Sequence, residues 1–138
     1  MKVEIKEWYT VKDVKANPNK LYVFGDNLER KGLGGQAIIR KEPNSYGIAT
    51  KLKPYSSEDS YMRDIELHKE DIEFDISNLE QLIKANKQYE YLVFPKDGLG
   101  TGLAKLDEKA PRLFLHLNSL LTKFGVKYNY ELKKLELL

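Results

Sequence analysis

Two glycine-rich segments are candidate ligand-binding loops. The first contains Gly32, Gly34 and Gly35, and the second has the sequence GLGTG at residues 98–102. Glycine permits positive φ angles and lets a ligand approach the main chain closely. Successive main-chain N–H groups can then bind phosphate oxygens without any lysine. We therefore predict a diphosphate pocket between the two segments, formed by Gly32, Gly34, Gly35, Gly98, Leu99, Gly100, Thr101 and Gly102.

Neither glycine segment matches a stricter phosphate-binding motif. Leu103 stands where the last glycine of G-x-G-x-x-G would be, and no Gly-Lys-Ser/Thr follows in either segment. An ordinary Rossmann dehydrogenase or a P-loop NTPase is therefore disfavoured. The alternative interpretation is that both segments are only tight structural turns.

Side chains beside the glycine segments could add contacts to a ligand. Arg30 could reach a phosphate with two hydrogen bonds, whereas Arg40 is expected to be solvated. Gln36 could hydrogen-bond a ribose or a base. The two histidines, His68 and His116, have no motif partner and are not expected to be catalytic.

Three aromatic residues near the predicted site are expected to be mainly structural. Tyr46 and Phe24 could stack on adenine, but packing is the favoured interpretation because the chain contains nine tyrosines. Trp8 is expected to cover the edge of the sheet.

Strands alternate with helices along the chain, which indicates an α/β fold. The pattern predicts strands near residues 3–8, 21–24, 46–50, 89–94 and 128–137, and helices at 36–41, from about 77, and at 107–124. Ser77 and Glu80 have the spacing of a capping box, so a helix is expected to begin there. The acidic segment 56–73 is expected to be a solvated loop or edge. We predict one three-layer domain over residues 1–138, with a central mixed sheet flanked by helices.

The composition excludes several classes of site. The 138 residues include no cysteine and only two histidines, so disulfides, thiolate nucleophiles and cysteine zinc sites are excluded, and we expect no metal and no cofactor. The net charge of +2 is small for a protein that grips a nucleic-acid backbone. Because the N-terminal segment is charged throughout, we expect it to be neither a signal peptide nor a membrane anchor. We expect a soluble, cytoplasmic protein without a membrane partner.

The order of the motifs from Leu21 to Phe124 resembles the macro domain, a family that binds ADP-ribose. A strand ends in an asparagine turn, a glycine loop opens a helix, and a later strand ends in Pro-x-x-Gly-x-Gly before a C-terminal helix. The similarity is greatest to the branch with the terminal ADP-ribose–glutamate hydrolases and the antitoxin that removes ADP-ribose from DNA. The pattern GDNL-x-R-x-G-x-GGQA at residues 25–37 is also similar to a small, mostly phage and bacterial set of proteins.

The resemblance implies roles for individual residues. Asn27 would lie near the distal ribose, and Lys51 would attack the anomeric carbon of that ribose. Such an attack needs a partly deprotonated lysine, and Lys53 could supply the cation that lowers its pKa. This sequence has Gly102 where the hydrolases have a loop aspartate.

The missing loop aspartate leaves two other carboxylates as candidates. Asp26 and Asp97 are the acidic residues beside the two glycine segments, and either could act as a general base or hold a ribose hydroxyl. Asp26 could also be an ordinary turn residue that caps its own loop. Binding is therefore favoured slightly over catalysis.

We predict that the chain binds ADP-ribose or a related nucleotide diphosphate, free or attached to protein or DNA, and whether it hydrolyses an ADP-ribosyl linkage stays open. The alternative is a non-catalytic module that binds protein or nucleic acid. It would use the basic residues Arg30, Lys31, Arg40, Lys41, Lys51 and Lys53.

Overall fold

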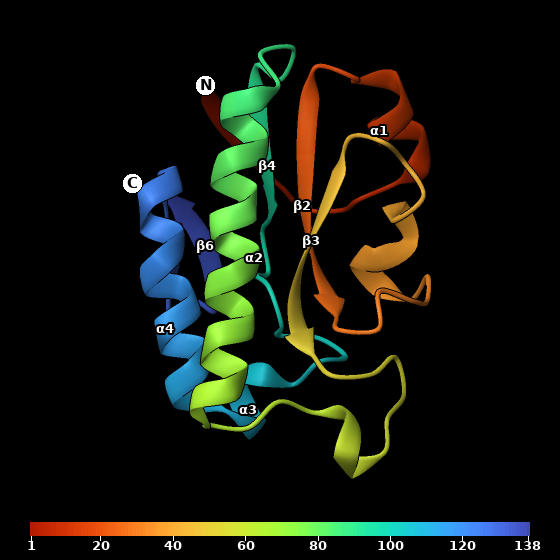
Figure 1. Ribbon diagram of the computed structural model, residues 1–138. Coiled ribbons are helices and arrows are strands. Elements are labelled where there is room, and N and C mark those ends of the chain that lie inside the picture. The colour runs from red at the N-terminus through yellow and green to blue at the C-terminus, as the bar shows by residue number, and fades with distance from the viewer.

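The computed structural model describes residues 1–138 and places a four-stranded parallel sheet at its centre (Figure 1). The strands lie in the order β1-β4-β2-β3, and every neighbouring pair is parallel. Their bounds are Lys2–Lys6 for β1, Lys20–Asn27 for β2, Ser45–Lys51 for β3 and Tyr91–Pro95 for β4. The predicted α/β class is confirmed.

The antiparallel pairing lies outside this sheet. Strands β5 (Val126–Asn129) and β6 (Lys134–Leu137) form a separate two-stranded hairpin. The Asn129 side chain accepts the N–H groups of Glu131 and Leu132, both at 3.0 Å, and so reverses the chain. The central sheet is therefore parallel rather than mixed, and the single strand predicted at 128–137 is a hairpin.

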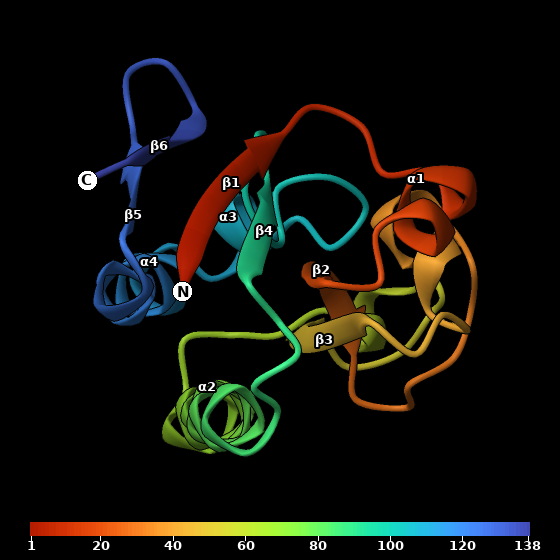
Figure 2. The same ribbon diagram turned by 90° about the horizontal axis from the view of Figure 1, so that it is seen from above.

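Helical elements cover both faces of the sheet and give three layers (Figure 2). Alternate residues of β2 point to opposite faces. Tyr22 and Phe24 pack with α1 (Val11–Ala16) and the 3-10 helix η1 (Gly35–Ile39). Leu21 and Val23 pack with α2 (Glu66–Ala85), α3 (Leu106–Lys109) and α4 (Pro111–Leu121). The helix predicted at 36–41 is thus the short η1.

Helix α2 begins at Glu66, well before the start predicted at Ser77. Its buried residues lie three or four positions apart along one face, but they include two polar residues; they are His68, Ile72, Asp75, Ile76 and Leu79. Only the first part of the acidic segment is irregular, apart from η2 (Glu58–Ser60). Acidic residues on the exposed face conceal the helical spacing in the sequence.

The helix predicted at 107–124 is divided into α3, α4 and η3 (Thr122–Phe124). Pro111 causes the break, because its ring disfavours the helical conformation for Ala110, which has φ −144° and ψ 68°. Asp64 caps α4 from a distant loop, accepting the N–H of Leu113 at 2.8 Å.

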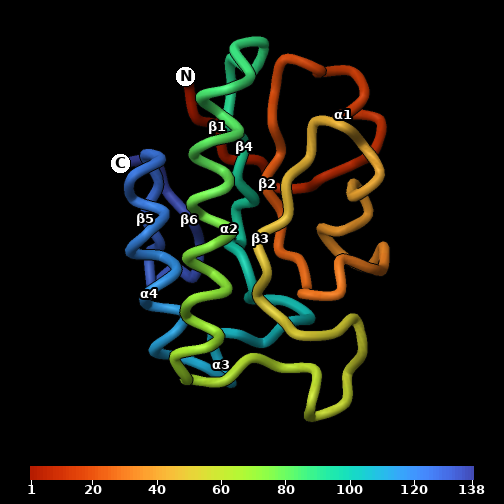
Figure 3. Tube along the Cα trace, in the orientation of Figure 1, coloured from red at the N-terminus to blue at the C-terminus, as the bar shows by residue number.

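The chain leaves β2, β3 and β4 at the same end of the sheet (Figure 3). We call residues 28–35, after β2, the first glycine loop, whose last residue also begins η1, and residues 96–105, after β4, the second glycine loop. The two therefore lie beside each other, as parallel pairing of β2 with β4 requires. None of the helices has the length and apolar character to span a lipid bilayer.

Candidate functional site

A pocket of about 450 Å³ lies across the carboxyl ends of all four parallel strands. Such edges are where open α/β sheets bind ligands. Trp8 follows β1 and lines one side, and Lys51 ends β3 and lines the other. Residues of the two glycine loops, which follow the central strands β4 and β2, line the middle.

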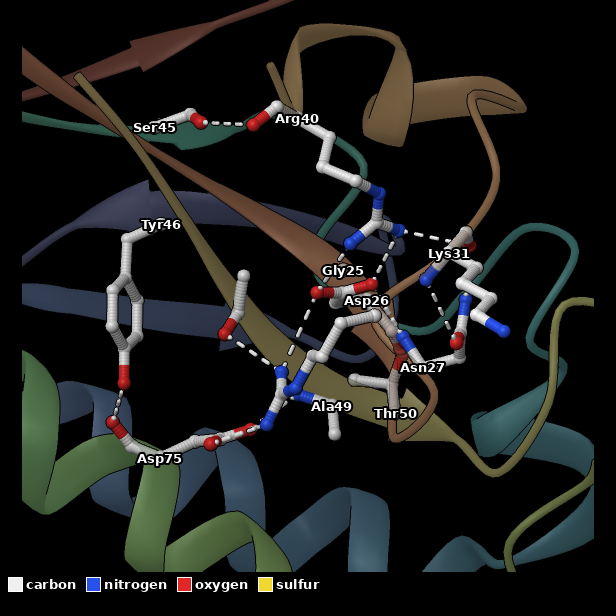
Figure 4. A network of polar contacts seen from close by, with 12 residues as sticks. Gly25, Asp26, Asn27, Lys31, Arg40, Ser45, Tyr46, Ala49, Thr50 and Asp75 are labelled. Atoms are coloured by element: carbon white, nitrogen blue, oxygen red, sulfur yellow. Dashed lines mark hydrogen bonds and ion pairs between the residues drawn. The ribbon is translucent and has the colours of Figure 1, made fainter. Parts of the chain in front are cut away.

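A buried ion pair closes the first glycine loop. The two carboxylate oxygens of Asp26 accept hydrogen bonds from the Arg40 guanidinium at 2.6 and 2.9 Å, and both side chains are largely buried. Arg40 also donates to the carbonyl of Lys31 at 3.0 Å (Figure 4). A further bond runs from Arg40 to the carbonyl of Gly32 at 2.9 Å. Arg40, which the sequence predicts to be solvated, therefore joins the two ends of the loop and donates hydrogen bonds to two of its carbonyl groups.

The first glycine loop is left with unused hydrogen-bond donors. Asn27 donates through Nδ2 to the carbonyl of Lys31 at 2.8 Å, so this carbonyl accepts twice. The main-chain N–H groups of residues 32–35 donate to no acceptor in the chain. Three of these four residues, Gly32, Gly34 and Gly35, line the pocket. The loop thus presents partial positive charge to the pocket.

The second glycine loop also has main-chain donors without acceptors, while several of its carbonyl groups do accept hydrogen bonds. Its carbonyls accept hydrogen bonds at Asp97, Gly98, Gly100 and Gly102. The N–H groups of residues 99–104 donate to no acceptor in the chain. Of these residues, Gly100, Gly102, Leu103 and Ala104 line the pocket. In the middle of the pocket, both walls therefore carry unpaired main-chain N–H groups, an arrangement suited to binding an anion.

Gln36, which follows the first glycine loop in η1, links β2 to the second glycine loop. Its Oε1 accepts the N–H of Gly25 at 2.9 Å, and its Nε2 donates to the carbonyl of Gly98 at 3.0 Å. Gln36 was predicted to contact a ligand. It lines the pocket, but both ends of its amide bind main chain, so its role is to set the width of the pocket.

The structure places most, but not all, of the predicted residues in the pocket. Asp26, Asn27, Gly32, Gly34, Gly35, Gln36, Lys51, Asp97, Gly100 and Gly102 line it. Gly98, Leu99 and Thr101 do not. The Leu99 side chain is 1% exposed and belongs to the core, Gly98 lies against Tyr128, and Thr101 turns back to the carbonyl of Asp97. The side chains of Leu99 and Thr101 are therefore used within the chain, but the N–H groups of both residues are free, so their contacts with a ligand stay a prediction.

The two candidate general bases differ in their surroundings. Arg40 and Arg30 both contact the buried Asp26 carboxylate, which also accepts the N–H of Asn27 at 2.7 Å. These contacts give Asp26 a structural role in the loop, and its predicted role as a general base stays a prediction. Asp97 is exposed at the pocket, and its carboxylate has no hydrogen-bond or ion-pair partner.

Lys51 is a buried cation without a counter-ion. It is only 9% exposed, and its Nζ takes part in no hydrogen bond or salt bridge, lying 5.3 Å from the ring centroid of Tyr61. Burial lowers the pKa of Lys51, and the positive charge of Lys105 lowers it further. The predicted cation, Lys53, instead pairs with Asp59 at 2.8 Å. Lys105 was missed because it lies beyond the recognisable motif.

The position of Trp8 also differs from the one that the sequence predicts. It does not cover the sheet edge but lines the pocket with 76% of its surface exposed. Its neighbours fix it on both sides, because Glu7 pairs with Lys96 at 2.8 Å and the Tyr9 hydroxyl donates to carbonyls of β2 and β4. An exposed tryptophan held in this way offers a flat surface for an aromatic group.

Arg30 and Tyr46 are used within the fold. Arg30 binds both carboxylate oxygens of Asp75 on α2, at 2.7 and 2.9 Å, and not a phosphate site. The Tyr46 hydroxyl donates to the carbonyl of Asp75 at 2.6 Å (Figure 4). Phe24 is buried in the core beside η1. Neither aromatic ring lines the pocket, so the packing interpretation holds for both.

One family model matches residues 4–120, a range that includes all four parallel strands and both glycine loops; it describes a family of unknown function (DUF7831). No curated protein and no solved structure matches the chain.

Gly100 and Gly102 allow a matched test of the second glycine loop. Gly100 has φ +82°, and a Cβ there would lie 2.9 Å from Cβ of Leu106 and 3.0 Å from Cβ of Thr50. Gly100→Ala is expected to lower the free energy of unfolding by about 2 kcal/mol or more, through strain and overlap. Gly102→Ala, where a Cβ meets nothing within 4 Å, is expected to be nearly neutral. Urea denaturation measures both, and equal losses would contradict the described loop.

Proposed function

The chain belongs to the family of unknown function DUF7831, and we propose that it binds a nucleotide diphosphate of the ADP-ribose type in the pocket at the strand ends. The observation that supports this most strongly is the imbalance of main-chain groups in both glycine loops. Several loop carbonyls accept hydrogen bonds within the chain, those of Lys31, Gly32, Gly34, Asp97, Gly98, Gly100 and Gly102, whereas the N–H groups of residues 32–35 and 99–104 are free. Donors without acceptors attract an anion.

A diphosphate fits this arrangement better than a single phosphate. The two loops follow neighbouring strands, β2 and β4. Gln36, directly after the first loop, binds Gly25 of β2 and Gly98 of the second loop, and so fixes the second loop beside the first. Each loop can therefore bind one phosphate of a bridged pair. Main-chain donors are fixed before the ligand arrives, which reduces the entropy lost on binding.

Trp8 supports a nucleotide over inorganic diphosphate. The order of the strands places Trp8 beside β1, next to the second glycine loop, and Lys51 at the far side beyond the first loop. In our proposal the base stacks on Trp8, the diphosphate lies between the loops, and the distal group reaches Lys51. The resemblance to macro domains agrees with ADP-ribose as the ligand.

Asn27 has a more indirect role in this proposal than the resemblance implies. Its Nδ2 donates to the carbonyl of Lys31, which holds the first glycine loop in shape. We propose that Asn27 acts first as a support for the loop, and that its contact with a distal ribose would come from the remaining donor and acceptor capacity of its amide.

The alternative, a protein or nucleic-acid interaction module, has less support. It requires a free basic surface, but Arg30 and Arg40 are bound to buried carboxylates and Lys53 is paired with Asp59. Half of the basic residues named for that surface are therefore neutralised within the chain.

Calorimetric titration with ADP-ribose, ADP and adenosine tests the proposal. Saturable binding of ADP-ribose and ADP, with none of adenosine, is expected. Arg40→Gln should weaken ADP-ribose binding at least about tenfold, because glutamine cannot span the Asp26 carboxylate and two loop carbonyls. Lys41→Gln, an exposed neighbour, should bind like the parent. Binding of adenosine as tight as that of ADP, or no loss in Arg40→Gln, would contradict the proposal.

Hydrolysis of an ADP-ribosyl linkage is a second candidate function, supported by the lowered pKa of Lys51. In this scheme the neutral amine of Lys51 attacks the anomeric carbon, the bond to the linking oxygen breaks, and that oxygen takes up a proton. Water then releases ADP-ribose and restores the amine. Asp97, the unpaired carboxylate of the pocket, is available to assist the water.

Release of ADP-ribose from modified protein and modified DNA tests this candidate. The rate should rise with pH through the lowered pKa of Lys51, since only the neutral amine attacks. Lys51→Ala is expected to abolish release, while Lys53→Ala should leave it unchanged because Lys53 pairs with Asp59 outside the pocket. Release by Lys51→Ala at the parental rate would rule out the lysine route.

A further inference from the structure

The outward side of α2 combines apolar and acidic side chains that no other element covers. Leu67 and Phe74 lie seven residues apart, which is about two helical turns, so their side chains point in the same direction. Leu67 is 62% exposed and Phe74 is 66% exposed. Figure 2 shows α2 at the outside of the molecule, with no element beyond it. We call Leu67, Glu70, Asp71 and Phe74 the outer face of α2.

Two carboxylates lie between the apolar side chains of this outer face. Glu70 and Asp71 are each three or four residues from both apolar residues, and side chains at these spacings are neighbours on a helix. The salt bridges of α2 belong instead to Glu73, Asp75 and Glu80. The outer face therefore carries two free negative charges between two exposed apolar groups.

Several other carboxylates of the same region are used within the fold. Glu58 and Asp59 form salt bridges with lysines, and Asp64 caps α4. Lys69, the only lysine or arginine in residues 66–75, lines a hollow beside α4 and forms no salt bridge with the outer face. Because the whole chain has a net charge of +2, the negative charge at this face is a local feature.

We propose that the outer face of α2 binds a basic amphipathic helix of another protein. Apolar residues of the partner would pack on Leu67 and Phe74, and lysines or arginines between them would pair with Glu70 and Asp71. An acidic partner would be repelled, and a purely apolar partner would bury both carboxylates without a counter-ion. Apolar residues seven apart also match the spacing at which two helices pack side by side.

The outer face of α2 is separate from the nucleotide pocket. None of its four residues lines that pocket. Binding of a partner protein here is therefore a further activity of the chain, which does not rest on the proposed function.

Fluorescence anisotropy with labelled synthetic peptides tests the surface. The probe is an alanine-based helix of about 20 residues, with leucine at every seventh position and lysine three and four positions after each leucine. One comparison peptide has the same composition in shuffled order, and another has glutamate in place of lysine. The ordered lysine peptide should bind at least about fivefold more tightly than the shuffled one, and the glutamate peptide should not bind. Binding should weaken as NaCl rises from about 50 to about 500 mM.

Matched variants locate the binding surface. Leu67→Ser should weaken binding of the ordered peptide at least about fivefold, whereas Leu132→Ser should bind like the parent. The two leucines are 62% and 61% exposed, and Leu132 lies in the turn of the β5–β6 hairpin. Glu70→Gln should weaken binding and reduce its salt dependence, while Glu131→Gln, another exposed carboxylate, should not. Circular dichroism confirms that each variant is folded.

Two results would overturn the proposal. Equal binding of the ordered and shuffled peptides, or equal binding by Leu67→Ser and Leu132→Ser, would show that only unspecific charge attraction is present. Light scattering of the chain alone gives the second result. A dimer that is lost in Leu67→Ser, but kept in Leu132→Ser, would assign the outer face to a second copy of this chain and not to a basic partner.

Discussion

The pocket depends on the ion pair between Asp26 and Arg40, which joins the end of β2 to the residue that follows η1. A buried ion pair contributes little net stability, but it fixes one arrangement of the chain, because either charge alone would be stranded. Here it closes the first glycine loop and gives the loop carbonyls a donor. Gly47 is required beside it, since a Cβ there would overlap the Asp26 carboxylate. Because Arg40 occupies the carbonyls of Lys31 and Gly32, these carbonyls do not need the N–H groups of the loop, which stay free.

The parallel sheet arranges the rest of the pocket. Because all four strands end at the same edge, an aromatic residue, two donor-rich loops and a buried lysine follow one another across it. This order gives the pocket a direction, from Trp8 on one side to Lys51 on the other. Arg30 continues the polar network to Asp75 on α2. Asp75 in turn accepts the N–H of Ala49 at 2.7 Å, and so anchors the edge strand β3 to the helix layer. The strand order and this polar network therefore stabilise both the sheet and the pocket at its edge.

The predictable part of the structure is the part that local patterns encode. Strands bounded by turn residues, the glycine loops after them and the lysine at a strand end all follow from short segments of sequence. The start of α2 was not predictable in this way, because Asp75 takes a place in its buried face where an apolar residue would be expected. Arg40 and Gln36 bind partners that are distant in sequence, so the local sequence pattern could not predict their contacts. Lys105 was missed for the same reason, since its effect on Lys51 is through space.

In the proposed function, the unpaired N–H groups of both glycine loops bind one diphosphate. Titration of the ¹⁵N-labelled protein with ADP-ribose, followed by amide chemical shifts, tests this directly. The amide signals of Gly34, Gly35, Gly100 and Gly102 should move together with a single affinity, and those of the β5–β6 hairpin should not move. Shifts confined to one loop, or amides of both loops that stay unmoved while ligand binds elsewhere, would contradict it.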